Sequence, residues 1–213
     1  KAKTYEIGTH YEGDALSGEL TAFFIDFDQE LYLSRNIVGE GLWTDLGATK
    51  HQGVEAAARY DLGSLSNTLD GLSLYANYTY TEATYEAGPF AGRDLPFYSR
   101  HFGTVGASYR YEDWVFNADL SAQSKQRSPG NAAEGAPYVE DEDATGRLGD
   151  IPGYGTVNLR LAYQPEDQEN APKLAFGVKN LLDKEYFTRS TDNNGGKFVG
   201  QPRTFFVNAS VAF

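Results

Sequence analysis

The sequence has 213 residues, no cysteine, no methionine and a formal net charge of −12 at pH 7. A chain this acidic lacks the basic footprint that binds nucleic-acid phosphates, so we expect no nucleic acid among its partners. No stretch approaches the about 20 apolar residues of a membrane helix, which excludes helical membrane proteins but not barrels. The chain does not begin with Met, and we expect a fragment or processed piece that forms one domain.

In chain order, the sequence divides into nine extended segments in which apolar and polar side chains alternate with the period of two typical of β-strands. In the fourth segment, Leu74 and Tyr78 lie on one face, whereas Ser73 and Asn77 lie on the other. The predicted segments are residues 4–12, 16–34, 49–61, 72–85, 98–111, 114–126, 153–163, 173–188 and a final strand clearest over 205–213.

The final strand is apolar on one face to its last residue, with Phe205, Val207 and Phe213 in alternate positions. A soluble domain more often ends in a polar, frayed tail. About nine to eleven tilted residues cross a bilayer as a strand, which matches the length of this segment. The pattern is the one expected if the last strand faces lipid.

The connections between segments alternate between short and long. Residues 13–14 and 112–113 form tight turns, and residues 62–71 and 164–172 form somewhat longer ones. The longer connections are expected to be loops over residues 36–46, 87–95, 128–150 and 190–196. The alternation slips at residues 26–28, where we expect a bulge or the point at which the strand leaves the membrane.

Alternation alone fits two architectures, a soluble β-sandwich with its apolar faces packed together or a transmembrane barrel with its apolar faces outward. Short turns at one end and longer loops at the other are typical of bacterial barrels. Single aromatic residues beside the short turns would form an interfacial girdle; they are Tyr11, Tyr60, Tyr111, Trp114 and Tyr163. We therefore predict an all-β, antiparallel up-and-down transmembrane β-barrel.

Several motifs add a family resemblance. The run NLLDKEY at 180–186 is followed by GQPR at 200–203 and an alternating strand that ends on Phe213. Upstream stand KAKTYEIG at 1–8, GVEAAARYDLG at 53–63, IPGY at 151–154 and AFGVKNLLD at 175–183. In order and spacing, these motifs resemble the TonB-dependent outer-membrane receptors, and among them the ferric-citrate (iron(III) dicitrate) receptors.

The resemblance implies a barrel of about 22 strands whose lumen is filled by a plug domain, of which residues 1–213 would be the C-terminal portion with the last nine strands. It implies an outer-membrane location in a Gram-negative bacterium and import of a ferric chelate such as ferric citrate, energised by TonB through the plug. The chelate is the transported ligand, and no cofactor is expected. The expected partners are this chelate, outer-membrane lipid and lipopolysaccharide, the plug of the same receptor and TonB.

The candidate ligand site follows from the resemblance and from loop chemistry. The family's ligand-contacting asparagine maps onto Asn193, and a ligand-contacting glutamine lies near Gln29; Asn194 and Arg189 are added as neighbours in the same loop region. An amide can donate to a citrate carboxylate without a fixed charge. The alternative is that Asn-Asn-Gly-Gly only makes a turn with positive φ.

Basic residues near the loops could attract an anionic chelate, although most should be ordinary loop charges. They are Arg35, Lys50, Arg93, Arg100, Arg127, Arg147, Arg189, Lys197 and Arg203. The acidic run 140–143 lacks the spacing of a calcium loop and is expected to be solvated. Charges on the polar faces could line a permeation path, but wall contacts to a plug or to each other are favoured; they are Glu55, Arg59, Arg110, Asp119, Arg160 and Lys179.

An enzyme is not expected. The three histidines, His10, His51 and His101, occur in different predicted strands, and none belongs to a recognisable catalytic motif. The alternatives to a ferric-citrate receptor are a TonB-dependent receptor for another siderophore or nutrient, and, from another class, a soluble β-sandwich binding module.

Overall fold

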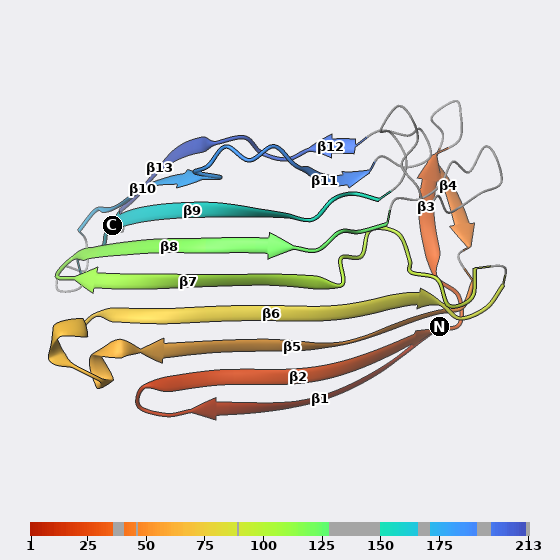
Figure 1. Cartoon of the computed structure of the whole chain (residues 1–213), viewed down its shortest axis with the longest axis horizontal. Helices are drawn as coiled ribbons and strands as arrows, with labels where there is room; N and C mark the ends of the chain where they lie inside the picture. The colour runs from red at the N-terminus through yellow and green to blue at the C-terminus, as the bar shows by residue number, and fades with distance from the viewer. Residues whose placement is uncertain are drawn as a thin grey trace.

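The computed structural model describes residues 1–35, 41–45, 47–88, 90–127, 150–165, 171–190 and 197–211. Its main feature is a 9-stranded antiparallel sheet in which each strand pairs with the next main strand of the chain (Figure 1). The strands of this sheet are β1 (Ala2–Glu12), β2 (Leu16–Phe27), β5 (Thr49–Asp61), β6 (Leu72–Tyr85), β7 (His101–Tyr111), β8 (Trp114–Gln123), β9 (Tyr154–Tyr163), β10 (Lys173–Lys179) and β13 (Thr204–Ser210).

The strand register gives the sheet one apolar face and one polar face. A continuous row of paired residues on the apolar face runs from β2 to β13 through Leu16, Tyr60, Leu74, Ala107, Ala118, Leu159, Val178 and Phe205. The neighbouring row on the polar face contains Ser17, Arg59, Tyr75, Gly106, Asp119 and Asn158. Because side chains alternate along a strand, this register carries the predicted pattern across the whole sheet.

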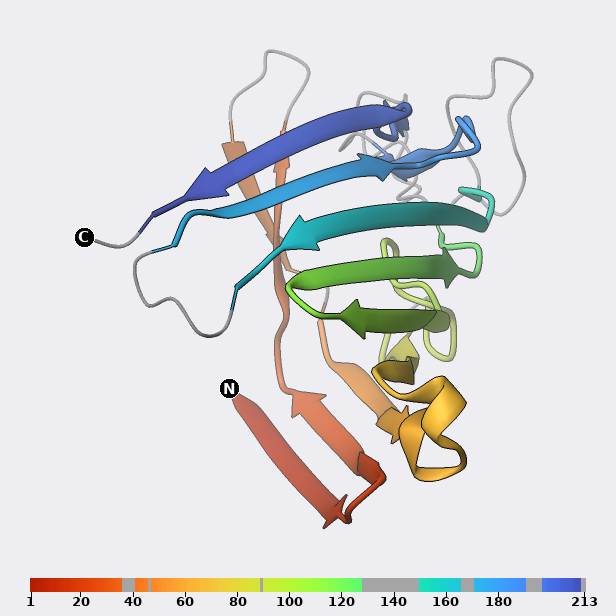
Figure 2. The same ribbon diagram turned by 90° about the vertical axis from the view of Figure 1, so that its left-hand side faces the viewer.

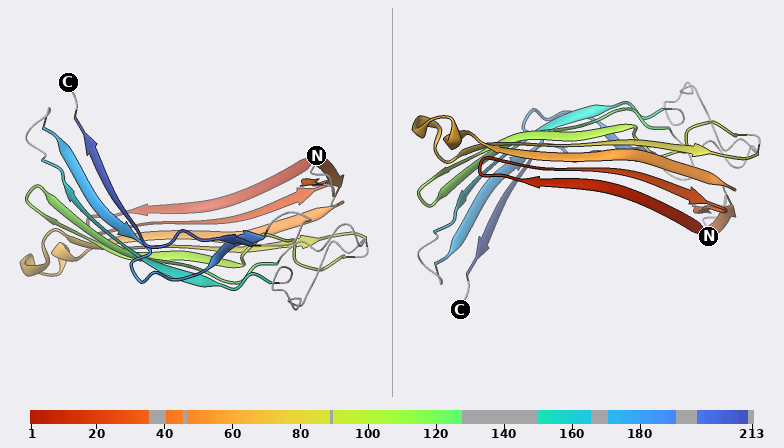
Figure 3. Two further views of the ribbon diagram at one scale, coloured as in Figure 1. Left: turned by 90° about the horizontal axis from the view of Figure 1, so that it is seen from above. Right: turned by 90° about the horizontal axis from the view of Figure 1, so that it is seen from below.

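The sheet is twisted and curved rather than flat, as Figures 2 and 3 show. Large side chains of its apolar face remain exposed: Leu74 is 46% exposed, Phe116 44% and Val207 65%. Within the described residues, the buried apolar clusters are small; one contains Ala83, Tyr85 and Leu95. A β-sandwich would bury these apolar faces against a second sheet, so the sandwich alternative does not describe this fold.

Aromatic side chains on the polar face cover glycines of the adjacent strand. A Cβ atom added to Gly177 would lie 2.3 Å from the ring of Phe206, its paired residue on β13. At Gly106 the added Cβ would lie 2.4 Å from the ring of Tyr75, its partner on β6. These positions therefore require glycine, because the ring occupies the space of a side chain and covers the bare strand.

Short turns join the strands at one end of the sheet and long connections join them at the other (Figure 1). The short-turn end includes the two-residue turn between β7 and β8 and two short 3-10 helices, η1 (Leu62–Ser64) and η2 (Asn67–Leu69). No helix of the described residues is long and apolar enough to cross a membrane. The long-connection end carries two small hairpins, one of β3 (Leu31–Arg35) with β4 (Gly41–Asp45) and one of β11 (Phe187–Ser190) with β12 (Lys197–Val199).

The predicted boundaries of β5 and β6 are confirmed, but several others are wrong. The predicted strand 16–34 ends at Phe27, where the alternation slips, and the chain turns into the separate strand β3. Part of the predicted loop 36–46 is the strand β4. The predicted strand 173–188 ends at Lys179, because Asn180 and Asp183 adopt positive φ values of 51° and 54° and turn the chain.

Three further predicted strands are slightly too long. The fifth begins at His101 rather than residue 98, after Phe97 with its positive φ of 71°, and the sixth ends at Gln123 rather than residue 126. The seventh begins at Tyr154. The polar segment 128–149, with the acidic run 140–143, lies outside the described residues.

Candidate functional site

The long-connection end carries the predicted ligand residues that the structure describes. Gln29 lies in the bend that follows β2 and is exposed, and Arg189 lies in β11, paired with Phe198 of β12. The structure therefore brings Gln29 and Arg189 to the same end of the sheet, on connections from different strands. Asn193 and Asn194 lie outside the described residues.

Backbone and side-chain bonds hold the bend that carries Gln29. The amide of Asp28 donates to the carbonyl of Lys1 at 3.0 Å, and the amide of Glu30 donates to the carbonyl of Gly47 at 3.0 Å. The Glu30 Oε2 accepts hydrogen bonds from Thr49 Oγ1 at 2.5 Å and from His51 Nε2 at 3.0 Å. The bend is thus tied to Lys1 just before β1, to Gly47 just before β5 and to the polar face of β5.

Glu30 and His51 form a largely buried pair. The His51 side chain is 7% exposed, and its ring lies edge-on to the rings of Phe27 at 5.3 Å and Tyr98 at 5.0 Å. Burial raises the pKa of the Glu30 carboxyl, but hydrogen bonds from His51 and Thr49 and the His51 charge outweigh it and hold that pKa below its ordinary value. Burial and the nearby Glu30 charge raise the pKa of the Tyr98 hydroxyl.

Ion pairs engage several of the predicted basic residues. Arg100 contacts Asp94 at 2.6 Å, and Arg127 and Lys125 contact the two oxygens of Asp150 at 2.7 and 2.8 Å. A cavity of about 380 Å³ is lined by four of these residues, Asp94, Arg100, Lys125 and Arg127, and also by Tyr98 and Gln126. An anion entering this cavity would meet three cationic groups that share the two carboxylates of Asp94 and Asp150.

Two more of the predicted basic residues have other settings. Lys197 lies 5.6 Å from the ring centroid of Phe187, and Arg203 contacts Asp183 at 3.4 Å. Arg147 lies outside the described residues. The sequence did not identify three further residues at this end of the sheet, Glu30, His51 and Lys125, as candidates. Their partners lie far away in the sequence, and no spacing marks them as neighbours in space.

The NLLDKEY motif has a structural role. Asn180 is buried, and its amide donates to the carbonyls of Lys184 at 2.9 Å and Gln201 at 3.0 Å, while its oxygen accepts from the amide of Lys184 at 2.8 Å. Asp183 Oδ1 accepts from the amide of Arg203 at 2.8 Å. The motif thus clamps the chain after β10 to the GQPR segment before β13.

This clamp continues into the polar face of the sheet. Asn158 accepts from the amide of Asn180 at 3.0 Å and donates to Asp119 at 2.7 Å. Beside it, Tyr154 and Tyr186 stack with ring centroids 4.0 Å apart and help to line a cavity of about 710 Å³. Asp119, predicted as a wall charge, is therefore part of a hydrogen-bonded wall.

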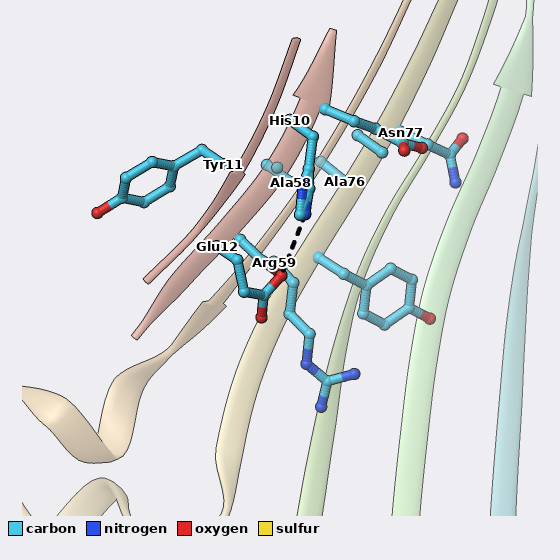
Figure 4. A pocket seen from close by; sticks show the side chains of 12 residues that line it. His10, Tyr11, Glu12, Ala58, Arg59, Ala76 and Asn77 are labelled. Atoms are coloured by element: carbon cyan, nitrogen blue, oxygen red, sulfur yellow. Dashed lines mark ion pairs between the residues drawn. The ribbon is translucent and has the colours of Figure 1, made fainter. Parts of the chain in front are cut away.

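A second group of polar-face charges lies near the short turns (Figure 4). His10 and Glu12 are 3.8 Å apart and, with Arg59, line a pocket of about 350 Å³, while Tyr11 projects away from them. The Arg59 guanidinium donates to the Ser73 hydroxyl at 2.9 Å. Among the described residues, no group of three or more acidic, His or Cys side chains could hold a metal ion.

The predicted aromatic girdle occupies the short-turn end of the apolar face. Tyr11 and Tyr111 are each 60% exposed, and the rings of Trp114 and Tyr163 lie 5.3 Å apart on paired positions of β8 and β9. Tyr60 belongs to the apolar row described above. Amphipathic rings at this level are expected where a barrel meets the membrane–water boundary.

Comparisons with known proteins agree on one family. A family model described as "TonB dependent receptor-like, beta-barrel" matches residues 1–181. The solved structure of the ferric citrate transporter FecA in the unliganded form is 39% identical, with a TM-score of 0.80, and the match covers 99% of this chain and 31% of that one. The copper transporter OprC has the same fold, with a TM-score of 0.74 at 19% identity, over 100% of this chain and 31% of that one.

Similarity to curated proteins is lower but extends over the whole chain. The catecholate siderophore receptor Fiu of Escherichia coli (strain K12) is 25% identical over 218 residues, which cover 100% of this chain and 26% of the relative. The chain thus spans about a quarter of that relative's length. The fold, the strand register and these matches together show that the chain belongs to the β-barrel family of TonB-dependent receptors, which lie in the outer membrane of Gram-negative bacteria.

Proposed function

We propose that this chain forms barrel wall and part of the extracellular mouth of a receptor that imports a ferric chelate, with ferric citrate as its ligand. The observation that carries the proposal is the 39% identity to the ferric citrate transporter FecA over 99% of the chain. The assignment of residues 1–213 to the C-terminal portion of such a barrel is part of the same proposal. TonB would act through the plug domain, and lipid and lipopolysaccharide would surround the apolar face.

The mouth would bind its ligand with polar groups of the long connections. Ferric citrate is anionic, so amide donors and a few cations are the fitting chemistry. Asn193 and Gln29 are the proposed amide donors, with Asn194 and Arg189 beside them. Arg100, Lys125 and Arg127 would also attract the chelate. Their attraction would act only over a short distance, because their carboxylate partners balance most of their positive charge.

A receptor for a different siderophore is the second candidate. The 25% identity to the catecholate siderophore receptor Fiu over 100% of the chain supports it. Loops carry ligand specificity and vary more than the wall that supports them, so the wall alone does not select one chelate. The two candidates differ in ligand and share the fold, the location and the mode of import.

Isothermal titration of the full-length receptor with ferric citrate and with a ferric catecholate tests the proposal. We expect saturable binding of ferric citrate and weaker or no binding of the catecholate. Asn193→Ala should weaken ferric-citrate binding about tenfold, the usual loss for one hydrogen bond to a charged group, whereas Asn67→Ala at the short-turn end should not. Tight binding of the catecholate alone would overturn the citrate assignment, and full affinity in Asn193→Ala would remove that residue from the site.

A further inference from the structure

The junction between the strand β2 and the hairpin β3–β4 contains a carboxylate, Glu30, that bonds back to the wall of the sheet. Glu30 lies three residues after the end of β2, and its side chain reaches back to Thr49 and His51 on β5. Thr49 and His51 are both buried, at 0% and 6% exposure. A buried charge costs free energy unless it is paired and hydrogen-bonded, and here two donors on one strand supply that pairing.

Two long connections meet at this pair. The β2–β5 connection supplies Glu30, and the β6–β7 connection supplies Tyr98, whose ring packs edge-on against His51 at 5.0 Å. The ring of Phe27 at the end of β2 also packs edge-on against His51, at 5.3 Å. His51 therefore touches the end of a membrane strand and both connections at once.

We propose that Glu30 and His51 are positioning residues that fix the β3–β4 hairpin and the β6–β7 connection relative to each other, and thereby hold Gln29 in place for ligand capture. The part that concerns capture rests on the proposed function; the part that concerns the two connections does not. Gln29 adjoins Glu30 directly, so any rotation of the Glu30 backbone moves it. The backbone hydrogen bonds of Asp28 and Glu30 set the path of the bend, and the side-chain hydrogen bonds of Glu30 to Thr49 and His51 set its position along β5.

Three variants of the full-length receptor separate this role from ordinary wall stability. Glu30→Gln keeps the shape and removes the charge. His51→Phe keeps the ring against Phe27 and Tyr98 and removes the donor, and His51→Gln restores a donor. Glu82→Gln is the matched control, because Glu82 accepts a hydrogen bond at 2.8 Å from Gln52, the residue next to His51.

The first readout needs no ligand. Hydrogen exchange should become about tenfold faster at the amides of Glu30, Leu95 and Phe97 in Glu30→Gln and in His51→Phe, since a hydrogen bond to a charged group contributes at least that factor. These amides are bonded to Gly47, Ala83 and Arg127 respectively, so they report on both connections. In His51→Gln the exchange rates should return toward the wild-type rates, and in Glu82→Gln they should equal the wild-type rates. Unchanged exchange at Leu95 and Phe97 in Glu30→Gln would overturn the coupling.

The second readout is the affinity for ferric citrate. We expect a loss of about tenfold in Glu30→Gln and in His51→Phe, and less than the sum of both losses in the double variant, because they remove one interaction. Faster exchange with unchanged affinity would overturn the role in capture. Failure of the wild-type receptor to bind any ferric chelate would refute the proposed function, whereas the exchange experiment would still decide whether Glu30 and His51 couple the two connections.

Discussion

Leu120 on β8 offers a direct test of which face of the sheet meets lipid. It lies on the apolar face, paired with Val105 of β7 and Val157 of β9, and is 44% exposed. If that exposed portion contacts lipid, Leu120→Ala should cost about 1 kcal/mol, a little under half the value for burying a whole leucine side chain. Leu120→Arg should cost about 3–5 kcal/mol, because an arginine near the midplane of the lipid face adds about 2–4 kcal/mol.

The neighbouring residue gives the matched control. Ser121 lies on the polar face, where its hydroxyl is 2.9 Å from that of Thr104. Ser121→Arg should therefore cost about 1 kcal/mol for the lost hydrogen bond, since its guanidinium stays in the polar lumen. Urea unfolding of the full-length receptor in lipid vesicles, followed through the barrel transition, measures the three free energies. A cost for Ser121→Arg equal to or above that for Leu120→Arg would refute the assignment of faces.

Three further predictions concern the wall and its loops. Asn180→Ala should destabilise the barrel by about 2–4 kcal/mol, because the Asn180 side chain makes three hydrogen bonds in a buried site. The urea midpoint of the full-length receptor measures this loss. A shift of the midpoint no larger than that of Asn67→Ala would contradict the prediction. Gly177→Ala should cost about 1–3 kcal/mol, since the new methyl group would overlap the ring of Phe206; a neutral result in the same assay would show that the ring moves aside freely. Folding lowers the pKa of Glu30, so the stability that its carboxylate adds is present above the ordinary pKa of a glutamate and is lost as the pH falls through the lowered pKa. Over that acidic range, hydrogen exchange at the Glu30 amide should become faster, relative to its intrinsic rate, in the wild type but not in Glu30→Gln. Parallel pH profiles of the two proteins would contradict this.

The alternation in the sequence was enough to predict the wall. Residues 49–61 and 72–85 have the predicted boundaries because side-chain parity never slips along them. The breaks were harder to predict, because they depend on backbone geometry that hydrophobic pattern does not encode. The strand predicted over 173–188 ends at Lys179, just before Asn180, whose side chain is bonded to residues that come later in the chain and whose φ is positive.

The candidate site was less predictable from sequence than the wall. A resemblance could suggest Gln29, but Glu30 and His51 are 21 residues apart, and only the register of β2 with β5 brings them together. The same holds for Lys125 and Arg127, which form ion pairs with Asp150 although a long stretch of sequence separates them from it. Pairing between distant segments of this kind requires the fold, since no local period marks it.

We expect the apolar face of each strand to contact lipid and the polar face to enclose the lumen. Spin labels placed one at a time along β8, from Trp114 to Gln123, in a cysteine-free background of the full-length receptor in vesicles measure this directly. Accessibility to oxygen should be high at the even-numbered positions, which include Phe116 and Leu120, and low at the odd-numbered ones. The opposite phase, or no period of two, would contradict it.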